Sequence, residues 1–177
     1  MIDHVMIDLE TMGNKSNAPI IAIGAVYFDP KTGQTGKEFY SEVSLESSVD
    51  LGAKPDPSTI LWWLGQSDAA RAKFINNKNS PHIILVLQQF AEFMNTRNVK
   101  PWGNGAGFDL GILGNAYDLA NMARPWEFWN ERDVRTIVDL DTRNHKKMPF
   151  DGIPHYALDD AKHQVKYVSA IIKDLTK

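Results

Sequence analysis

Two carboxylates stand two residues apart near the start of the chain, at the end of a short apolar run. Residues 4–9 (HVMIDL) have the composition of a buried strand, which contains Asp8 and leads into Glu10. Because alternate residues of a strand point to the same face, both carboxylates would project together, with Leu9 on the opposite side. Such a pair favours a cation between the two charges, although solvated charges at a strand end would give the same pattern.

A third acid follows a glycine-rich segment. Residues 103–107 (GNGAG) come directly after a short apolar stretch, and Phe108 and Asp109 then begin a helical pattern. The glycines do not fit a dinucleotide-binding loop, because Phe108 occupies the position of the third required glycine. An acid in a first helical turn can serve only the helix dipole. Asp109 is a candidate ligand because of its neighbours: a buried strand is expected to end shortly before it, and the glycine-rich residues 103–107 leave much of the backbone between them without side chains.

The last candidates lie where a polar loop meets the final helix. His155 follows Gly-Ile-Pro, and Asp159 and Asp160 come four and five residues later. On one helix, His155 and Asp160 would be about 140° apart, so they converge only if His155 is still on the loop. Helical phase then turns Asp159 away from a site that Asp160 faces. A polar residue at a helix start is the alternative interpretation of His155.

Taken together, the three segments form an ordered pattern of D-x-E, F-D and H-x-x-x-x-D. This pattern resembles the DEDD 3′→5′ exonucleases of the branch that contains histidine (DEDDh). The resemblance runs from Asp8 to Asp160 and thus covers most of the chain. In size and in residues 61–72, the sequence is most similar to ribonuclease T and the small phage-type exonucleases.

The resemblance implies a metal site and a mechanism. Asp8, Glu10, Asp109 and Asp160 would hold two Mg²⁺ ions, which Mn²⁺ could replace, because hard oxygen ligands suit these ions. His155 would be the general base that takes a proton from the attacking water. The product would be a nucleoside 5′-monophosphate released from the 3′ end.

Four residues are candidates for binding the substrate. Backbone groups of Leu9 and Thr11 could meet the terminal 3′-OH, and Phe108 could stack on a base. Met12 could wedge between the last two bases, or it could be an ordinary loop hydrophobe. The basic run 143–147 (RNHKK) could hold upstream phosphates or be a solvated loop. Trp102 belongs to the core by its position in an apolar stretch, whereas the other tryptophans could belong to the core or the rim.

The order of elements predicts a single α/β or α+β domain with a mixed sheet. The resemblance implies the α/β, ribonuclease H-like form of it: a mixed five-stranded sheet whose first three strands are antiparallel, flanked by helices, in a single exonuclease domain of residues 1–177. The apolar patterns predict strands at 4–9, 19–28, 37–43 and 99–102, and helices at 59–64, 68–74, 82–94, 108–121 and 156–175. Residues 133–141 fit a short helix or a strand. Expected helix caps are Ser58, Ser67 and Ser80.

Composition limits the partners. The chain has 177 residues, 43% of them hydrophobic, no cysteine and a formal net charge of −3. The missing cysteines exclude thiolate metal sites and disulfides, and no signal peptide or membrane segment is evident, so we expect a cytoplasmic protein. An acidic chain lacks the broad basic face that grips duplex, which favours single-stranded DNA or RNA 3′ ends as partners. A homodimer is left open.

Other functions share part of this pattern. A ribonuclease H-type endonuclease would use the same fold and metals but would not need His155. A binding or proofreading module with weak catalysis would not need all five candidate positions, which are filled here. A glycosidase would use two carboxylates without metals. The sequence contains no short motif that separates RNA from DNA.

Overall fold

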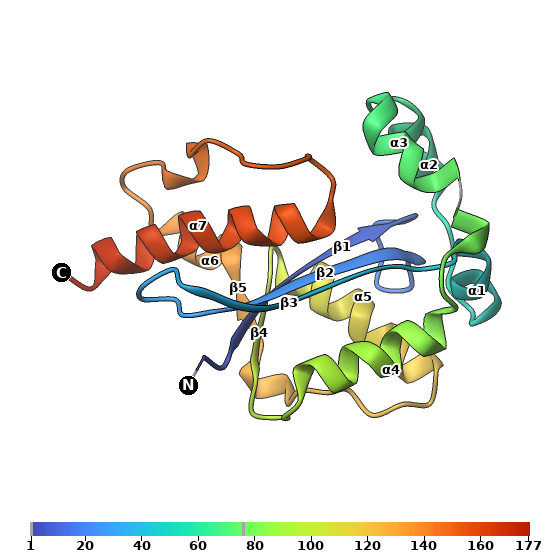
Figure 1. Cartoon of the computed structure of the whole chain (residues 1–177), viewed down its shortest axis with the longest axis horizontal. Helices are drawn as coiled ribbons and strands as arrows, with labels where there is room; N and C mark the ends of the chain where they lie inside the picture. Colours follow the sequence, from blue (N-terminus) through green and yellow to red (C-terminus); the bar gives the residue numbers. More distant parts are fainter. Residues whose placement is uncertain (1, 76) are drawn as a thin grey trace.

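A single mixed sheet forms the centre of the computed structural model, which describes residues 2–75 and 77–177. Within these residues the sheet has five strands in the order β3-β2-β1-β4-β5 (Figure 1). Strands β1, β2 and β3 pair antiparallel, whereas β4 pairs parallel with β1 and β5 pairs parallel with β4. The expected mixed sheet with three antiparallel leading strands is therefore confirmed. The strands are β1 (His4–Thr11), β2 (Ile20–Phe28), β3 (Thr35–Glu42), β4 (Lys100–Gly103) and β5 (Arg132–Asp133).

Helices cover both faces of the sheet (Figure 1). Alternate residues of β1 divide the core: Val5 and Ile7 pack with α4 and α5 on one face, and Met6 packs with α6 and α7 on the other. The helices are α1 (Leu45–Asp50), α2 (Pro57–Leu64), α3 (Asp68–Ile75), α4 (Ile83–Met94), α5 (Ala106–Leu119), α6 (Val134–Asp139) and α7 (Ala157–Leu175). None of the described helices is long and apolar enough to cross a membrane.

Several predicted boundaries were wrong for local reasons. Helix α2 is capped by Asp56, whose carboxylate accepts from the backbone of Ser58 and Thr59, with Pro57 in the first helical turn. Helix α4 starts after His82, whose Nδ1 accepts from the Ile84 N–H, and not after Ser80. A carboxylate before proline is a stronger start signal than the serine that follows it.

Other elements were missed or confirmed. Helix α1 was not predicted; it is short and is capped by Ser44, whose hydroxyl accepts from the Ser47 N–H. Residues 133–141 divide between the end of β5 and helix α6. The cap at Ser67 is confirmed, since its hydroxyl accepts from the Ala70 N–H at 3.3 Å.

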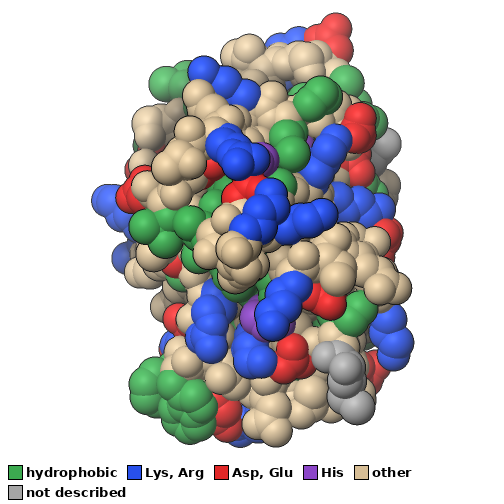
Figure 2. Space-filling view, turned by 90° about the vertical axis from the view of Figure 1, so that its left-hand side faces the viewer, with side chains coloured by type: hydrophobic (Ala, Val, Ile, Leu, Met, Phe, Trp, Pro, Cys, Tyr) green, Lys and Arg blue, Asp and Glu red, His purple; other side chains and the backbone are tan. Residues whose placement is uncertain are grey.

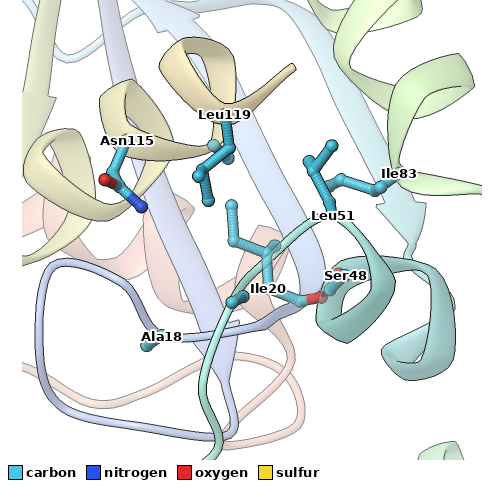
Figure 3. A pocket seen from close by; sticks show the side chains of 9 residues that line it. Ala18, Ile20, Ser48, Leu51, Ile83, Asn115 and Leu119 are labelled. Atoms are coloured by element: carbon cyan, nitrogen blue, oxygen red, sulfur yellow. Dashed lines mark hydrogen bonds between the residues drawn. The ribbon is translucent and has the colours of Figure 1, made fainter.

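One internal hollow lies between α1, α5 and the start of β2 (Figure 3). Its volume is 10 Å³, which is about the space of one water molecule. Side chains of Ile20, Leu51, Ile83 and Leu119 surround it, and the Ser48 hydroxyl is already donated to the Ile20 carbonyl. The hollow is a packing defect of the core and is too small to hold a substrate.

Candidate active site

The first two carboxylates lie on the side of the sheet that α7 covers. Asp8 and Glu10 stand opposite Gly24 and Ala22 of β2 in the antiparallel register. Asp8 is half-buried and Glu10 is 9% exposed. Strand alternation thus places both acids on one face, as the D-x-E spacing predicted.

Gly24 brings the last helix onto these acids. A Cβ atom at this position would lie only 2.2 Å from the carbonyl carbon of Ala157, the first residue of α7. Only glycine leaves room for backbone to approach backbone this closely. Since Gly24 stands directly opposite Asp8, the start of α7 is held beside the carboxylates of β1.

Asp109 joins them from the first turn of α5 and is almost fully buried. Its Oδ1 accepts from the Leu9 N–H at 3.2 Å, and its Oδ2 accepts from the Asn104 N–H at 2.9 Å. Burial raises the pKa of Asp109 to about 7 against these hydrogen bonds, which lower it. A Cβ on Gly103 would lie 3.0 Å from that of Asp109, so the glycine-rich segment allows strand and helix to meet tightly.

His155 and the two acids after it divide as helical phase predicted. Asp160 faces the cleft, whereas Asp159 Oδ2 accepts from the Ile153 N–H at 2.9 Å and ties the loop to the helix. His155 has φ of +63°, a left-handed backbone that is uncommon outside glycine and often marks a functional position. Its ring makes edge contacts with Trp62 and Trp63, at centroid distances of 5.1 and 5.9 Å.

Asp8, Glu10, His155 and Asp160 line one open cleft of 330 Å³, whereas Asp109 is buried and is not among its lining residues. One ligand atom from each of Glu10, His155 and Asp160 lies within 4.8 Å of the others. The cleft is lined by Asp8, Leu9, Glu10, Thr11, Gly13, Asn14, Thr59, Trp62, Trp63, Asn104, Phe108, His155, Asp160 and Gln164. The structure therefore gathers residues from β1, α2, α5 and α7, which are up to 156 positions apart in the chain.

The four proposed substrate residues do not all reach this cleft. Leu9, Thr11 and Phe108 line it, although the Leu9 N–H is donated to Asp109. The Thr11 hydroxyl donates to the Gly13 carbonyl at 2.7 Å. Met12 lies in a buried apolar cluster with Trp63, so its placement favours the loop-hydrophobe alternative.

The sequence analysis missed one residue of the cleft, Gln164, and left Trp62 and Trp63 between core and rim. Gln164, one helical turn after Asp160, donates from Nε2 to Asp8 Oδ1 at 2.7 Å. Trp62 is 47% exposed at the rim, whereas Trp63 is buried and donates its indole N–H to the Thr11 carbonyl. The spacing of Gln164 from Asp160 was a readable signal, because residues i and i+4 share a helix face.

The basic run 143–147 is built into the fold at another place. Arg143 pairs with Asp174 at 3.2 Å, and His145 pairs with Asp141 at 2.8 Å and with Asp174 at 3.3 Å. None of its residues lines the cleft. The described contacts thus use two of its basic groups to anchor a loop, and Lys146 and Lys147 are exposed.

Proteins similar to this chain include named nucleases. The exodeoxyribonuclease of Enterobacteria phage T4 is 28% identical over 199 residues, covering 93% of this chain and 86% of the relative. The nuclease domain of 3′hExo, a DEDDh family member solved with bound rAMP, has a TM-score of 0.62 at 15% identity, with 97% and 92% of the two chains covered. Pop2p of S. pombe, solved with Mg²⁺ and Mn²⁺, has a TM-score of 0.65 at 14% identity, covering 96% and 82%.

The family match defines a nuclease, specifically a 3′→5′ exonuclease, whose fold is that of a DEDDh family member. The chain belongs to the family described as the 3′-5′ exoribonuclease Rv2179c-like domain, which it matches over residues 3–172. The resemblance inferred from the acidic motifs is therefore confirmed at the level of the family.

The crowded acids lead to a prediction about stability. Burial first, then the charge of Asp109 and those of the other two acids, raise the pKa of Asp8 well above its ordinary value of 3.8. Because the pKa of Asp8 is raised and that of Asp109 is raised to about 7, the metal-free folded protein holds protons that the unfolded chain releases between about pH 4 and about pH 7. Its free energy of unfolding therefore falls as pH rises through this window, by something on the order of a few kcal/mol.

Removing one charge is expected to recover part of this loss. In EDTA, Asp8→Asn should melt above wild type at about pH 8, and the difference should shrink at about pH 5, where the wild-type acids regain protons. Saturating Mg²⁺ should stabilise wild type by mass action, by about 2.7 kcal/mol at a hundred times the dissociation constant, and the variant by less. An apo variant that melts well below apo wild type would contradict the crowding of like charges around Asp8.

Proposed function

We propose that this exonuclease is metal-dependent and removes nucleoside 5′-monophosphates from the 3′ ends of single-stranded nucleic acid or 3′ overhangs. The observation that carries the proposal is the convergence of acids from β1 and α7 with His155 around one cleft, with the buried Asp109 of α5 close enough for its charge to act on Asp8. The charges of Asp109, Glu10 and Asp160 all raise the pKa of Asp8, which supports a shared site for these acids.

The residues present fit a hard divalent cation. Glu10, His155 and Asp160 bring three candidate ligand atoms within 4.8 Å of one another, and Asp8 is their electrostatic neighbour. Mostly oxygen donors favour Mg²⁺ or Mn²⁺ over softer metals. We assign Asp8, Glu10, Asp109 and Asp160 as the ligands of two such ions. Bound there, the ions would offset the charge of the scissile phosphate and act as Lewis acids.

His155 is assigned the role of general base. The aromatic edges of Trp62 and Trp63 hold its ring at the mouth of the cleft, beside Glu10 and Asp160. A ring nitrogen would take a proton from the attacking water as its oxygen bonds to phosphorus. The bond between phosphorus and the 3′ oxygen of the preceding nucleotide breaks, and that oxygen gains a proton from solvent.

The rim of the cleft offers a place for the terminal nucleotide. Phe108 is partly exposed and could stack on a base, and Trp62 offers a second aromatic surface. Leu9 and Thr11 line the cleft, and their backbone groups would bind the terminal 3′-hydroxyl. Met12 would act indirectly, by packing against Trp63, which lines the cleft.

The remaining sequence-based expectations stay predictions. They are the single domain of residues 1–177, the cytoplasmic location, the homodimer, and the choice between DNA and RNA. A relative named an exodeoxyribonuclease and a family described as exoribonucleases support both nucleic acids as candidates.

The test is digestion of end-labelled single-stranded RNA and DNA with Mg²⁺, with Mn²⁺ and with EDTA. Mononucleotides should appear from the 3′ end only when metal is present. A 3′-phosphate on the same strand should stop the reaction, since the terminal hydroxyl no longer fits near Leu9 and Thr11. Cleavage of a circular single strand would identify an endonuclease, and full activity in EDTA would remove the metal from the mechanism.

A further inference from the structure

A basic groove lies beside α7, outside the cleft. It has a volume of 400 Å³ and is formed by the turn between β2 and β3 on one side and by α7 on the other. Four lysines and no acid are among its lining residues. They are Lys31 of the turn and Lys162, Lys166 and Lys173 of the helix. In a chain with an overall charge of −3, this is a local concentration of positive charge.

The three helix lysines form a straight row. At about 100° per residue, positions 162, 166 and 173 lie within roughly 40° of one another around α7, and they span about 16 Å along it. The opposite face of α7 packs on the sheet through Val168 and Ile171. Figure 2, which looks at the end of the molecule with the β2–β3 turn and the C-terminus, shows Lys and Arg side chains gathered on this face with fewer acids among them.

The recorded ion pairs leave part of this charge available. Lys162 pairs with Glu38 of β3 and Lys166 with Asp151, each at 2.8 Å. Among the described residues, no ion pair is recorded for Lys31 or Lys173. A groove with such a surplus attracts an anion with several evenly spaced charges more strongly than a single small anion.

The row begins within one helical turn of the cleft residues of α7, but on the other side of the helix. Lys162 follows the proposed ligand Asp160 by two residues, which places the two about 160° apart, so a strand leaving the cleft would cross the first turn of α7 to reach the groove. Beside the start of α7, Tyr40 of β3 stacks with Tyr156, the residue before α7, at a centroid distance of 4.3 Å. Along the seam of α7 and β3, aromatic rings are therefore followed by the Glu38–Lys162 pair and then by the lysine row.

We propose that this groove binds the phosphate backbone of the substrate strand upstream of its 3′ end. This inference rests on the proposed function and extends it, because it makes affinity depend on strand length while the cleft holds only the terminal nucleotides. Each nucleotide of a strand carries one backbone charge, so a row of about 16 Å can contact more than one phosphate.

The sharpest test uses the two lysines without a recorded ion pair. Binding of a single strand of about 20 nucleotides, which is long enough to occupy both the cleft and the groove, is measured by fluorescence anisotropy. EDTA is present so that hydrolysis does not interfere. Lys31→Gln/Lys173→Gln should bind about tenfold more weakly at low salt. The slope of log affinity against log salt should become shallower by about 1.4, at about 0.7 per lost phosphate contact. The charge-matched control is Lys146→Gln/Lys147→Gln, whose exposed lysines lie outside the groove.

Hydrolysis of a trinucleotide with Mg²⁺ separates this inference from the proposed function. The groove variant should hydrolyse the trinucleotide at the wild-type rate while losing its preference for the longer strand. Wild-type affinity and salt slope in the groove variant would overturn the inference, and so would an equal loss in the control variant. Failure of wild type to hydrolyse either strand, with the binding effect present, would reject the proposed function and leave the groove in place.

Discussion

Replacing Asp8 by alanine is expected to lower turnover by about 10³-fold or more, and EDTA should have the same effect on wild type. A bound metal ion contributes several kcal/mol of charge stabilisation, and each 1.36 kcal/mol changes the rate tenfold. Asp8 is central because the charges of the other three acids all act on it. Turnover is measured with a 3′-end-labelled strand at saturating Mg²⁺. Near wild-type turnover in Asp8→Ala would show that the metal site is wrongly assigned.

Asp109→Ala should lose activity to the same extent, but it also tests the fold. Both oxygens of Asp109 accept buried backbone N–H groups, those of Leu9 and Asn104. Truncation leaves two donors unsatisfied, at about 1–3 kcal/mol each. A thermal melt must therefore accompany the assay, and activity lost in a folded variant supports the assignment.

The neighbouring acids of α7 provide a matched pair of variants. Asp160→Asn should be nearly inactive, because it removes a charge from the cleft. Asp159→Asn should stay active, because its remaining oxygen can still accept from the Ile153 N–H. The two changes are chemically identical and lie one residue apart. A larger loss from Asp159→Asn would contradict the placement of α7 relative to the site.

The acids of the cleft were predictable because their positions follow from local geometry. Strand alternation places Asp8 and Glu10 on one face, and helical phase separates Asp159 from Asp160. Each of these inferences needs only the few residues around it. The ordered pattern then linked the separate segments to a known family, which the match over residues 3–172 confirms.

The residues that sequence reasoning missed act through contacts between distant segments. Gln164 contacts Asp8 across 156 positions, and Gly24 looks like an ordinary strand residue until α7 packs against it. The contacts of Trp62 and Trp63 with His155 likewise depend on where α2 packs in the fold, which the local sequence pattern does not predict. Met12 shows the reverse case, because its position beside the motif suggested substrate contact whereas packing buried it.

The second large effect concerns His155. Its removal is expected to slow the chemical step by about 10²–10⁴-fold, the usual contribution of a general base. Alanine alone would be an imperfect test, because residue 155 has φ of +63° and a side chain with a Cβ is strained there. His155→Asn is the better variant, since asparagine tolerates the left-handed region and keeps the backbone in place. His155→Gly relieves the strain altogether and serves as the control for side-chain loss.

Metal binding decides between the two roles that the geometry permits for His155. A ring nitrogen lies within 4.8 Å of ligand atoms of Glu10 and Asp160, a distance compatible with a base beside the metals or with a ligand. If His155 is the base, the Mn²⁺ calorimetric isotherms of His155→Asn and His155→Gly stay close to that of wild type while single-turnover hydrolysis slows. If His155 is a metal ligand, the same variants lose both Mn²⁺ affinity and hydrolysis rate. Because the four carboxylates already supply the negative charge that a hard cation requires, we expect binding to survive and the rate alone to fall.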